Sequence, residues 1–284
     1  MLQKLLNDNQ TSLKTRLNLT VTLIVTIFIF SIFQIISLSN AEKTVNFDIK
    51  KEKITLFGIF STPSKFHRRN LIRSTYLQLV DDTNIDYKFV VGRPNNREEL
   101  ELLQFENKKF NDLMILDIEE NMNDGKTFHY FQTVYYKFKQ NKYKFVMKVD
   151  DDTFLHLPNF EKKFSTLPTT GLYFGRYWGS VKHRNGFMTG MGYALSWDLV
   201  EHIAEEVPLA GKSIIGQEDG LVPSWIGEKA VNTISEDLEY YDSPKSNEDW
   251  AKNYTDGTLL IHRLKRDDWF LNASTHFLKD YLDL

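Results

Sequence analysis

Hydrophobic residues between positions 53 and 150 fall into short runs that are separated by longer stretches of mixed character. Four runs have the length and composition of buried strands: 54–60, 87–92, 113–118 and 143–149. Three stretches between them have helical length: 67–80, 97–109 and 126–140. Strands that alternate with helices in this way predict parallel βαβ units, so we expect an α/β fold whose sheet is covered on both faces.

A longer uncharged segment precedes this region. No charged residue lies between Arg16 and Glu42, and a helix over 17–38 is long enough to cross the hydrocarbon core of a membrane. Its apolar residues occupy the whole helix circumference, which is unlike a helix that packs on one side of a core. The expected organisation is a cytoplasmic tail, a transmembrane signal anchor, a short stem and one large domain: 1–16, 17–38, 39–52 and 53–284.

A cleaved signal peptide is the alternative for this segment, because Ser37 and Ser39 are small residues suited to cleavage. Lysines on both sides leave the positive-inside rule undecided. The short tail and the glycosylation sequons at Asn253 and Asn272 are consistent with a C-terminal part in a lumen. We therefore expect a single-pass protein with its large domain on the luminal side.

Charge and composition exclude some classes of function. The formal net charge of −3 argues against a general nucleic-acid binder, which needs a basic face. The chain has no cysteine, so disulfides and thiolate metal sites are excluded. Any metal ion must be held by oxygen ligands or histidine.

Three adjacent carboxylates, Asp150, Asp151 and Asp152, directly follow the run 143–149. A hard divalent cation would relieve their mutual repulsion, because such ions take oxygen ligands. Alternate side chains of an extended chain share a face, so we expect Asp150 and Asp152 to point into a site and Asp151 to point away. A solvated turn, or a cap for a following helix, is the alternative. In open α/β sheets ligands bind outside the carboxyl ends of the strands, where this cluster falls.

Several segments, taken in order along the chain, resemble the motifs of the β-1,3-glycosyltransferases of glycosyltransferase family 31. The segment 69–76 resembles R-x-x-I-R-x-T-W with Tyr in place of Trp, and 148–154 (KVDDDTF) resembles K-x-D-D-D-x-F. The other segments that match are a strand, a Lys-Thr pair, a G-x-G-Y-x-x-S segment and an Glu-Asp pair: 89–92, 126–127, 190–196 and 218–219.

This resemblance implies a GT-A fold behind the single N-terminal membrane helix, and a single-pass type II enzyme of the Golgi membrane. It implies an inverting hexosyltransferase that moves galactose or N-acetylglucosamine from a UDP-sugar to a glycan hydroxyl in β-1,3 linkage, as in protein glycosylation, with Mn²⁺ as cofactor. The chain departs from the family at Gly220, where a valine is usual, in the short segment between Trp178 and Phe187, and in its lack of cysteine. These departures leave the acceptor open.

The resemblance also assigns roles. Asp219 is the expected general base, and Asp150, Asp152 and His262 are the expected metal ligands. The alternative for Asp219 is an acidic first turn of a helix, which the helix dipole favours. A lone histidine such as His262 is otherwise often structural.

The expected contacts to the nucleotide donor come from Lys148, Asp150 and Arg73. Arg69 and Arg73 lie one helical turn apart, and an arginine fork suits phosphate oxygens, so we expect Arg73 to contact the nucleotide. A solvated helix surface is the alternative for both arginines.

Two other functions remain open at this point. One is a retaining transferase on the same fold, which would differ in the stereochemistry of its product. The other is a non-catalytic, membrane-tethered carbohydrate-binding protein, although all four of Asp150, Asp151, Asp152 and Asp219 are present.

Overall fold

The computed structural model describes residues 27–34, 52–140, 143–237, 239–245 and 251–281, and the chain divides into two compact units, 1–50 and 51–284. In the first unit, residues 27–34 form a helix with exposed side chains. Within the described ranges no helix has both the length and the apolar character needed to cross a membrane. Most of the predicted anchor 17–38, and almost all of the tail and stem, lie outside the described residues, so the anchor stays a prediction.

A seven-stranded sheet organises the second unit, in the order β3-β2-β1-β4-β7-β6-β8. Its strands are β1 Thr55–Phe60, β2 Ile85–Arg93, β3 Leu113–Glu119, β4 Phe145–Asp150, β6 Leu172–Trp178, β7 Phe187–Ser196 and β8 Asn232–Ser235. The first four run parallel to one another, as the alternation of strands and helices predicts. Strand β7 runs antiparallel to both β4 and β6, so the complete sheet is mixed.

A second, three-stranded sheet has the order β5-β10-β9, and its strand β5 follows β4 closely in sequence. Its strands are β5 Phe154–Leu155, β9 Tyr240–Asp242 and β10 Leu260–His262. Strands β9 and β10 are parallel and in register, so Asp242 and His262 end them side by side.

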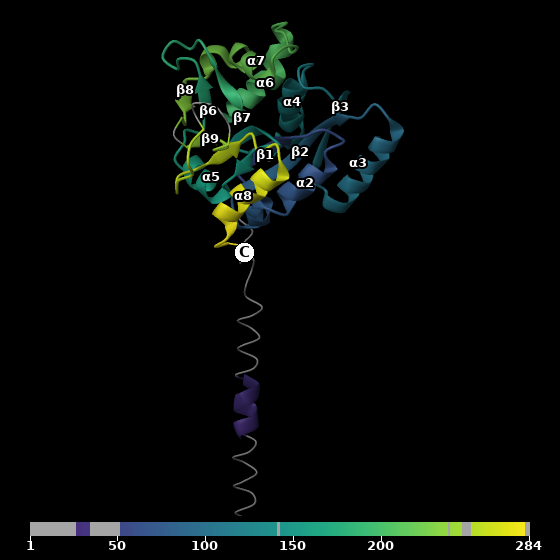
Figure 1. Ribbon diagram of the computed structural model, residues 1–284, viewed down its shortest axis with the longest axis vertical. Helices are drawn as coiled ribbons and strands as arrows, with labels where there is room; N and C mark the ends of the chain where they lie inside the picture. Colours follow the sequence, from purple (N-terminus) through teal and green to yellow (C-terminus); the bar gives the residue numbers. More distant parts are fainter. Residues whose placement is uncertain (1–26, 35–51, 141–142, 238, 246–250, 282–284) are drawn as a thin grey trace, which may run out of the picture. The chain divides into compact units, whose positions relative to one another are not determined.

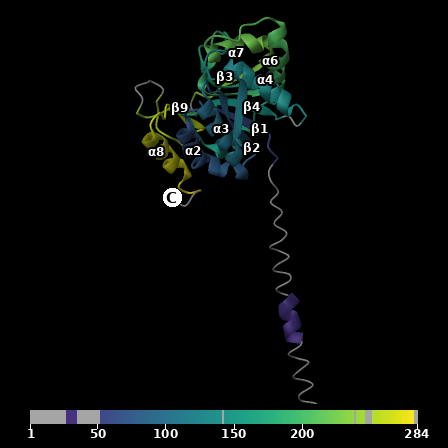
Figure 2. The same cartoon turned by 90° about the vertical axis from the view of Figure 1, so that its right-hand side faces the viewer.

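Helices cover both faces of the large sheet (Figures 1 and 2). The helical segments are α2 Phe66–Arg73, η1 Tyr76–Asp82, α3 Arg97–Phe110, α4 Lys126–Phe138, α5 Leu157–Phe164, α6 Trp197–Leu209, α7 Glu218–Ile226, η2 Gly227–Lys229 and α8 Asp267–Leu278. One hydrophobic cluster joins the sheet to α2, α5 and α8, and the other joins it to α4, α6 and α7. Strand β1 is buried along its whole length, as expected for a central parallel strand.

The predicted helix over 67–80 is interrupted. Helix α2 ends at Arg73, and a 3₁₀ helix begins at Tyr76. The hydroxyl of Thr75 donates to the carbonyl oxygens of Leu71 and Ile72, at 2.9 and 3.2 Å, and its backbone leaves the helical region. A threonine that hydrogen-bonds the preceding turn competes with the helix, which explains the break.

Strand register places the candidate active-site residues at one edge of the large sheet, the edge where its parallel strands have their carboxyl ends. The last paired residue of β4 before the acidic cluster is Val149, opposite Gly192 of β7. Residues 187–190 of β7 therefore extend beyond Asp150, the last residue of β4. The loops after β1, β3 and β4 open at this same edge, because these strands are parallel.

Candidate active site

A pocket of about 940 Å³ opens at this edge. Strand-end loops, the first residues of α2, α4 and α7, and the end of β10 form its walls. The residues that line it are Phe60, Ser61, Thr62, Lys65, His67, Arg68, Glu120, Asn121, Met122, Lys126, Asp150, Asp151, Asp152, Glu218, His262, Arg263 and Lys265. The pocket therefore brings carboxylates and cationic side chains together.

Asp150, Asp152 and His262 converge on one point of this pocket. One ligand atom from each lies within 4.8 Å of the others. His262 Nε2 is 3.5 Å from Asp152 Oδ1 and 4.0 Å from Asp150 Oδ2. Asp152 Oδ1 is buried and accepts no hydrogen bond from the described residues. A buried carboxylate oxygen without a donor is costly unless a cation is near, so this group fits a hard divalent ion.

The other ring nitrogen of His262 is held by a fully buried carboxylate. His262 Nδ1 lies 2.9 Å from Asp242 Oδ1, and Arg263 Nε is 3.5 Å from the second oxygen of Asp242. A proton on Nδ1 that is donated to Asp242 leaves the Nε2 lone pair facing the two aspartates. A carboxylate behind a histidine in this way is typical of metal sites, where it fixes the tautomer of the ligand.

Asp151 takes a different partner. Its Oδ1 accepts a hydrogen bond from Lys65 Nζ at 2.8 Å, and its side chain is 6 % exposed. It is therefore not in the three-residue group, although it also lines the pocket.

Lys148 links the acidic cluster to the start of α7. Its Nζ lies 2.8 Å from Asp150 Oδ1, 2.6 Å from Glu218 Oε1 and 3.8 Å from Asp219 Oδ1, and it donates to the carbonyl oxygen of Gly190 at 3.0 Å. The side chain is only 1 % exposed and does not line the pocket. The structure therefore places Lys148 behind the carboxylates rather than in reach of a donor.

Glu218 and Asp219 form the acidic first turn of α7, but their environments differ. Glu218 lines the pocket, whereas Asp219 does not; its side chain is 17 % exposed and lies beside Gly190 and Lys148. Burial opposes ionisation of Glu218, yet Lys148, Thr127 and Lys126 together lower the pKa of this carboxyl. Burial, with the charges of Glu218 and Asp150, raises the pKa of Asp219 to about 6, although Lys148 and the backbone N–H of Gly190 oppose the shift. Two neighbouring carboxylates pushed apart in this way are suited to different roles, and the one with a pKa near neutrality is suited to proton transfer.

Arg73 requires a correction. Its guanidinium donates to Asp112 at 2.8 Å, to Glu106 at 2.6 Å and to Asn70 at 2.8 Å, and it stacks on the ring of Phe110. Arg73 does not line the pocket, so the nucleotide contact expected for it was wrong. Its side chain is directed from α2 toward α3, where it pairs with Glu106 of α3 and with Asp112 just after that helix.

Arg68, one residue before the matched arginine of the motif, lies in the pocket instead. Its Nη2 donates to the carbonyl oxygen of Lys265 at 3.0 Å and lies 3.2 Å from Asp267 Oδ1. Its Nη1 is buried and has no hydrogen-bond acceptor in the described part of the chain. A buried guanidinium with a free donor at a pocket wall is suited to an anionic ligand.

Sequence reasoning missed Arg68, Asp242 and Lys65 as members of this site. A signal for Asp242 did exist, because YYD and LIH are two short apolar runs that each end in a residue able to ionise. Nothing in the sequence alone showed that these two runs pair in register. Arg68 gave no signal that separates it from Arg69 beside it.

Comparison with known proteins agrees with this geometry. Residues 67–170 match the family model "Galactosyltransferase". Residues 67–170 therefore resemble a galactosyltransferase-family domain. The match includes the acidic cluster and ends before β6, so Asp219 and His262 lie outside it.

Two curated relatives have related names. The chain is 26 % identical over 288 residues to "Beta-1,3-galactosyltransferase pvg3" of Schizosaccharomyces pombe, covering 79 % of this chain and 74 % of that protein. It is 28 % identical over 150 residues to "Lactosylceramide 1,3-N-acetyl-beta-D-glucosaminyltransferase" of Xenopus tropicalis, covering 49 % of this chain and only 39 % of that protein. These similarities support a role in glycosyl transfer.

A solved structure with a weaker likeness is that of a mannosyltransferase from Pyrobaculum calidifontis in complex with GDP-Man and Mn²⁺. It is 14 % identical, the alignment covers 66 % of this chain and 56 % of that one, and the TM-score is 0.39. A likeness of that size carries no argument about this chain.

Proposed function

We propose that the protein is an inverting, metal-dependent glycosyltransferase with a GT-A fold. It transfers galactose or N-acetylglucosamine from a UDP-sugar to a hydroxyl of an acceptor glycan, in β-1,3 linkage. The observation that carries the proposal is the position of Lys148, which lies within 4 Å of both Asp150 of the candidate metal group and Asp219. The proposed metal group and the proposed base thereby lie close to one shared buried cation.

Asp150, Asp152 and His262 are the proposed ligands of Mn²⁺, with Asp242 behind the histidine. The bound ion would neutralise the diphosphate of the donor and stabilise UDP as a leaving group. The unpartnered Oδ1 of Asp152 and the mixed oxygen and imidazole ligands support this choice.

The cationic side chains of the pocket are the proposed site of the donor's diphosphate. Arg68 offers its free Nη1, and Lys65 is held at the pocket wall by Asp151. Lys126 is less available, because it donates to the carbonyl oxygen of Ser61 at 2.7 Å and pairs with Glu120 at 2.6 Å. Arg68 therefore takes the role that the sequence analysis gave to Arg73.

Asp219 is the proposed general base. It takes the proton of the acceptor hydroxyl while the hydroxyl oxygen forms a bond to the anomeric carbon of the donor. The bond from that carbon to the UDP oxygen breaks on the opposite face, and its electron pair leaves with UDP. A pKa near 6 keeps Asp219 ionised at neutral pH and still basic enough to assist.

We further propose that the protein is a single-pass type II protein of the Golgi membrane that acts in protein glycosylation. The uncharged segment 17–38, the short tail before it and the glycosylation sequons at Asn253 and Asn272 support this proposal.

The direct test is a transfer assay with full-length protein in detergent and Mn²⁺, using a panel of UDP-sugars and GDP-mannose. We expect UDP release and acceptor-dependent transfer with UDP-galactose or UDP-N-acetylglucosamine, and loss of both in Asp152→Ala. An α-linked product from an α-linked donor would support the retaining alternative. Sugar binding without turnover would support the carbohydrate-binding alternative.

A further inference from the structure

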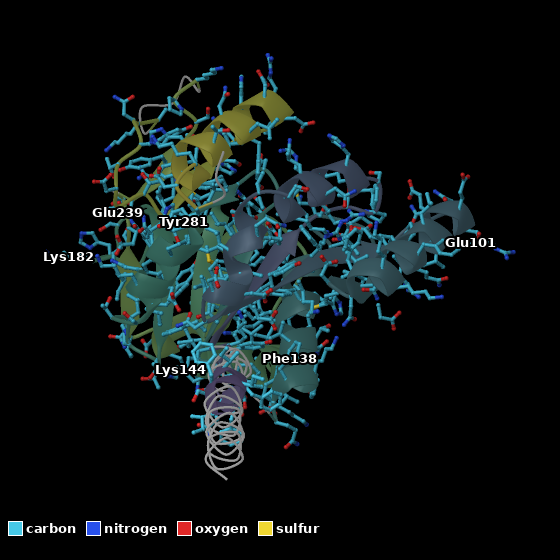
Figure 3. The ribbon with its side chains drawn as sticks, turned by 90° about the horizontal axis from the view of Figure 1, so that it is seen from below. Glu101, Phe138, Lys144, Lys182, Glu239 and Tyr281 are labelled. Atoms are coloured by element: carbon cyan, nitrogen blue, oxygen red, sulfur yellow. The ribbon has the colours of Figure 1, made fainter. Side chains whose placement is uncertain are left out.

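Helix α3 carries an apolar surface that nothing in the described chain covers. Its buried face is formed by Leu103 and Glu106, which point into the body. On the adjoining face, the side chains of Leu102 and Phe105 are 62 % and 70 % exposed. Figure 3 shows α3 reaching away from the rest of the domain, with Glu101 at its outer side.

A groove of about 440 Å³ runs between α3 and the start of α2. Leu102, Phe105 and Phe110 line it from α3, and Phe66, which is 49 % exposed, lines it from α2. Exposed apolar residues that are grouped in this way, rather than scattered, mark an interaction surface.

The charged residues along α3 indicate which partner fits this surface. Glu98, Leu102, Phe105 and Lys109 follow one another at intervals of four, three and four residues, so they form one stripe along the exposed face of α3. The stripe has apolar residues at its centre, an acid at its first end and a base at its last end. If the stripe is read in the opposite direction and each charge is replaced by the opposite one, the order of charged and apolar positions is unchanged. The stripe is therefore complementary to a second, antiparallel copy of itself.

We propose that this face pairs with α3 of a second copy of the chain, in an antiparallel arrangement about a twofold axis. Glu98 then meets Lys109 of the second copy, Lys109 meets Glu98, and Leu102 packs against Phe105 in both directions. A twofold interface is self-complementary by necessity, and this stripe satisfies that condition. A parallel pair would place Glu98 on Glu98 and Lys109 on Lys109, which the charges oppose.

The pairing lies next to the candidate active site but does not depend on its chemistry. Pro63 and Ser64 line the groove, while Thr62 and Lys65 of the same loop line the larger pocket. A second copy would therefore lie close to a loop that also lines the proposed donor site.

The test is sedimentation velocity of the full chain in density-matched detergent over a range of protein concentrations. We expect a dimer, and we expect Leu102→Asp or Phe105→Asp to make it a monomer. Leu209→Asp is the matched control, because Leu209 is 81 % exposed on α6, and it should leave the dimer intact. A wild-type monomer at all concentrations, or a dimer that survives Leu102→Asp, would overturn the proposal.

Charge reversal tests the orientation. Glu98→Lys or Lys109→Glu alone replaces two attractive contacts by two repulsive ones, and should weaken the dimer roughly 5- to 30-fold. Mixing the two variants, or combining both changes in one chain, restores opposite charges at both contacts and should restore the dimer. No recovery in the mixture would contradict the antiparallel register.

The lack of native cysteine allows a second test of the register. Under mild oxidation, a mixture of Glu98→Cys and Lys109→Cys chains should cross-link, whereas neither variant alone should do so. Cross-linking of Glu98→Cys with itself would indicate a parallel pair and overturn the proposed arrangement.

Discussion

One buried lysine gives the two carboxylates at the start of α7 different properties. Lys148 Nζ is 2.6 Å from Glu218 but 3.8 Å from Asp219, and Glu218 also accepts a hydrogen bond from Thr127. Glu218 is therefore stabilised as a carboxylate and lacks the basicity needed to take a proton. Asp219 Oδ1 is buried and accepts no hydrogen bond from the described residues, so burial dominates and the pKa of Asp219 is raised.

The raised pKa of Asp219 predicts a dependence of stability on pH. The pKa is 3.8 for an ordinary aspartate and about 6 in the folded chain, so folding favours the protonated form. Its contribution to stability is complete below pH 4 and is lost as the pH rises through 6. Asp219→Asn removes this loss, so we expect the variant to gain up to about 3 kcal/mol relative to wild type between pH 4 and pH 7.5.

Denaturant unfolding of both proteins in the presence of chelator would measure this difference. A difference in free energy of unfolding that stays constant from pH 4 to pH 7.5 would show that Asp219 has an ordinary pKa.

A second prediction for a single residue concerns the role of Asp242 in metal binding. Its carboxylate is fully buried and orients His262, so Asp242→Asn should weaken Mn²⁺ binding about 10- to 100-fold while the three ligands stay in place. Asp117→Asn is the control, because the Asp117 side chain is 95 % exposed and lies outside the pocket. Titration of Mn²⁺ against both variants measures the effect, and equal affinities would exclude Asp242 from the metal site.

At the scale of elements, the hairpin of β6 and β7 positions Asp219. Strand β7 passes the end of β4 and brings Gly190 against α7, where a Cβ atom on Gly190 would lie 2.6 Å from Asp219 Oδ2 and 3.0 Å from Lys148 Nζ. The strand can approach this closely only because position 190 has no side chain.

Gly190→Ala should therefore displace the Asp219 carboxylate and lower kcat about 10- to 100-fold, since a shift on the order of 1 Å at a reacting group has that cost. Mn²⁺ affinity should change less than kcat, because the ligands lie on other elements and Lys148, which contacts Asp150, is farther from the added Cβ than Asp219 is. Gly220→Ala is the matched control, because a Cβ at Gly220 meets nothing within 4 Å. Near-native kcat in Gly190→Ala would mean that the carboxylate at 219 need not be held in place.

The elements up to β4 could be predicted from the sequence, and those after it only in part. Strands such as β1 and β4 are short apolar runs between helices, and such runs predict buried parallel strands whatever the later topology. The break in the first predicted helix depends on the hydroxyl of Thr75, and the antiparallel β7 depends on how the sheet is completed. Periodicity contains neither kind of information.

The residues of the candidate site could likewise be predicted from the sequence only in part. The carboxylates at the end of β4 were predictable, because a parallel strand delivers its last residues to the ligand-binding edge. The nucleotide contact was wrongly predicted for Arg73 because its actual partners, Glu106 and Asp112, lie more than 30 residues away in sequence. A buried ion pair of this kind can be found only when the packing of α2 against α3 is known.

For the whole molecule, the main prediction concerns the segment 17–38. Full-length protein should remain with membranes through alkaline carbonate extraction, because an apolar helix of this length is not removed by breaking ionic contacts. The large domain should be protected from protease in sealed vesicles and become sensitive when detergent is added. Release into the soluble fraction would indicate a cleaved signal peptide instead of an anchor.

The central claim is that Asp219 acts as the base of a transfer reaction whose donor is held by a separate metal group. The most direct measurement is kcat and donor affinity for Asp219→Asn and Asp152→Ala, side by side with wild type. Asp219→Asn should lower kcat about 10²- to 10⁴-fold with donor affinity nearly unchanged, because an amide cannot accept the proton. Asp152→Ala should impair both donor affinity and turnover. Near-native kcat in Asp219→Asn would contradict the account and move the base to another residue.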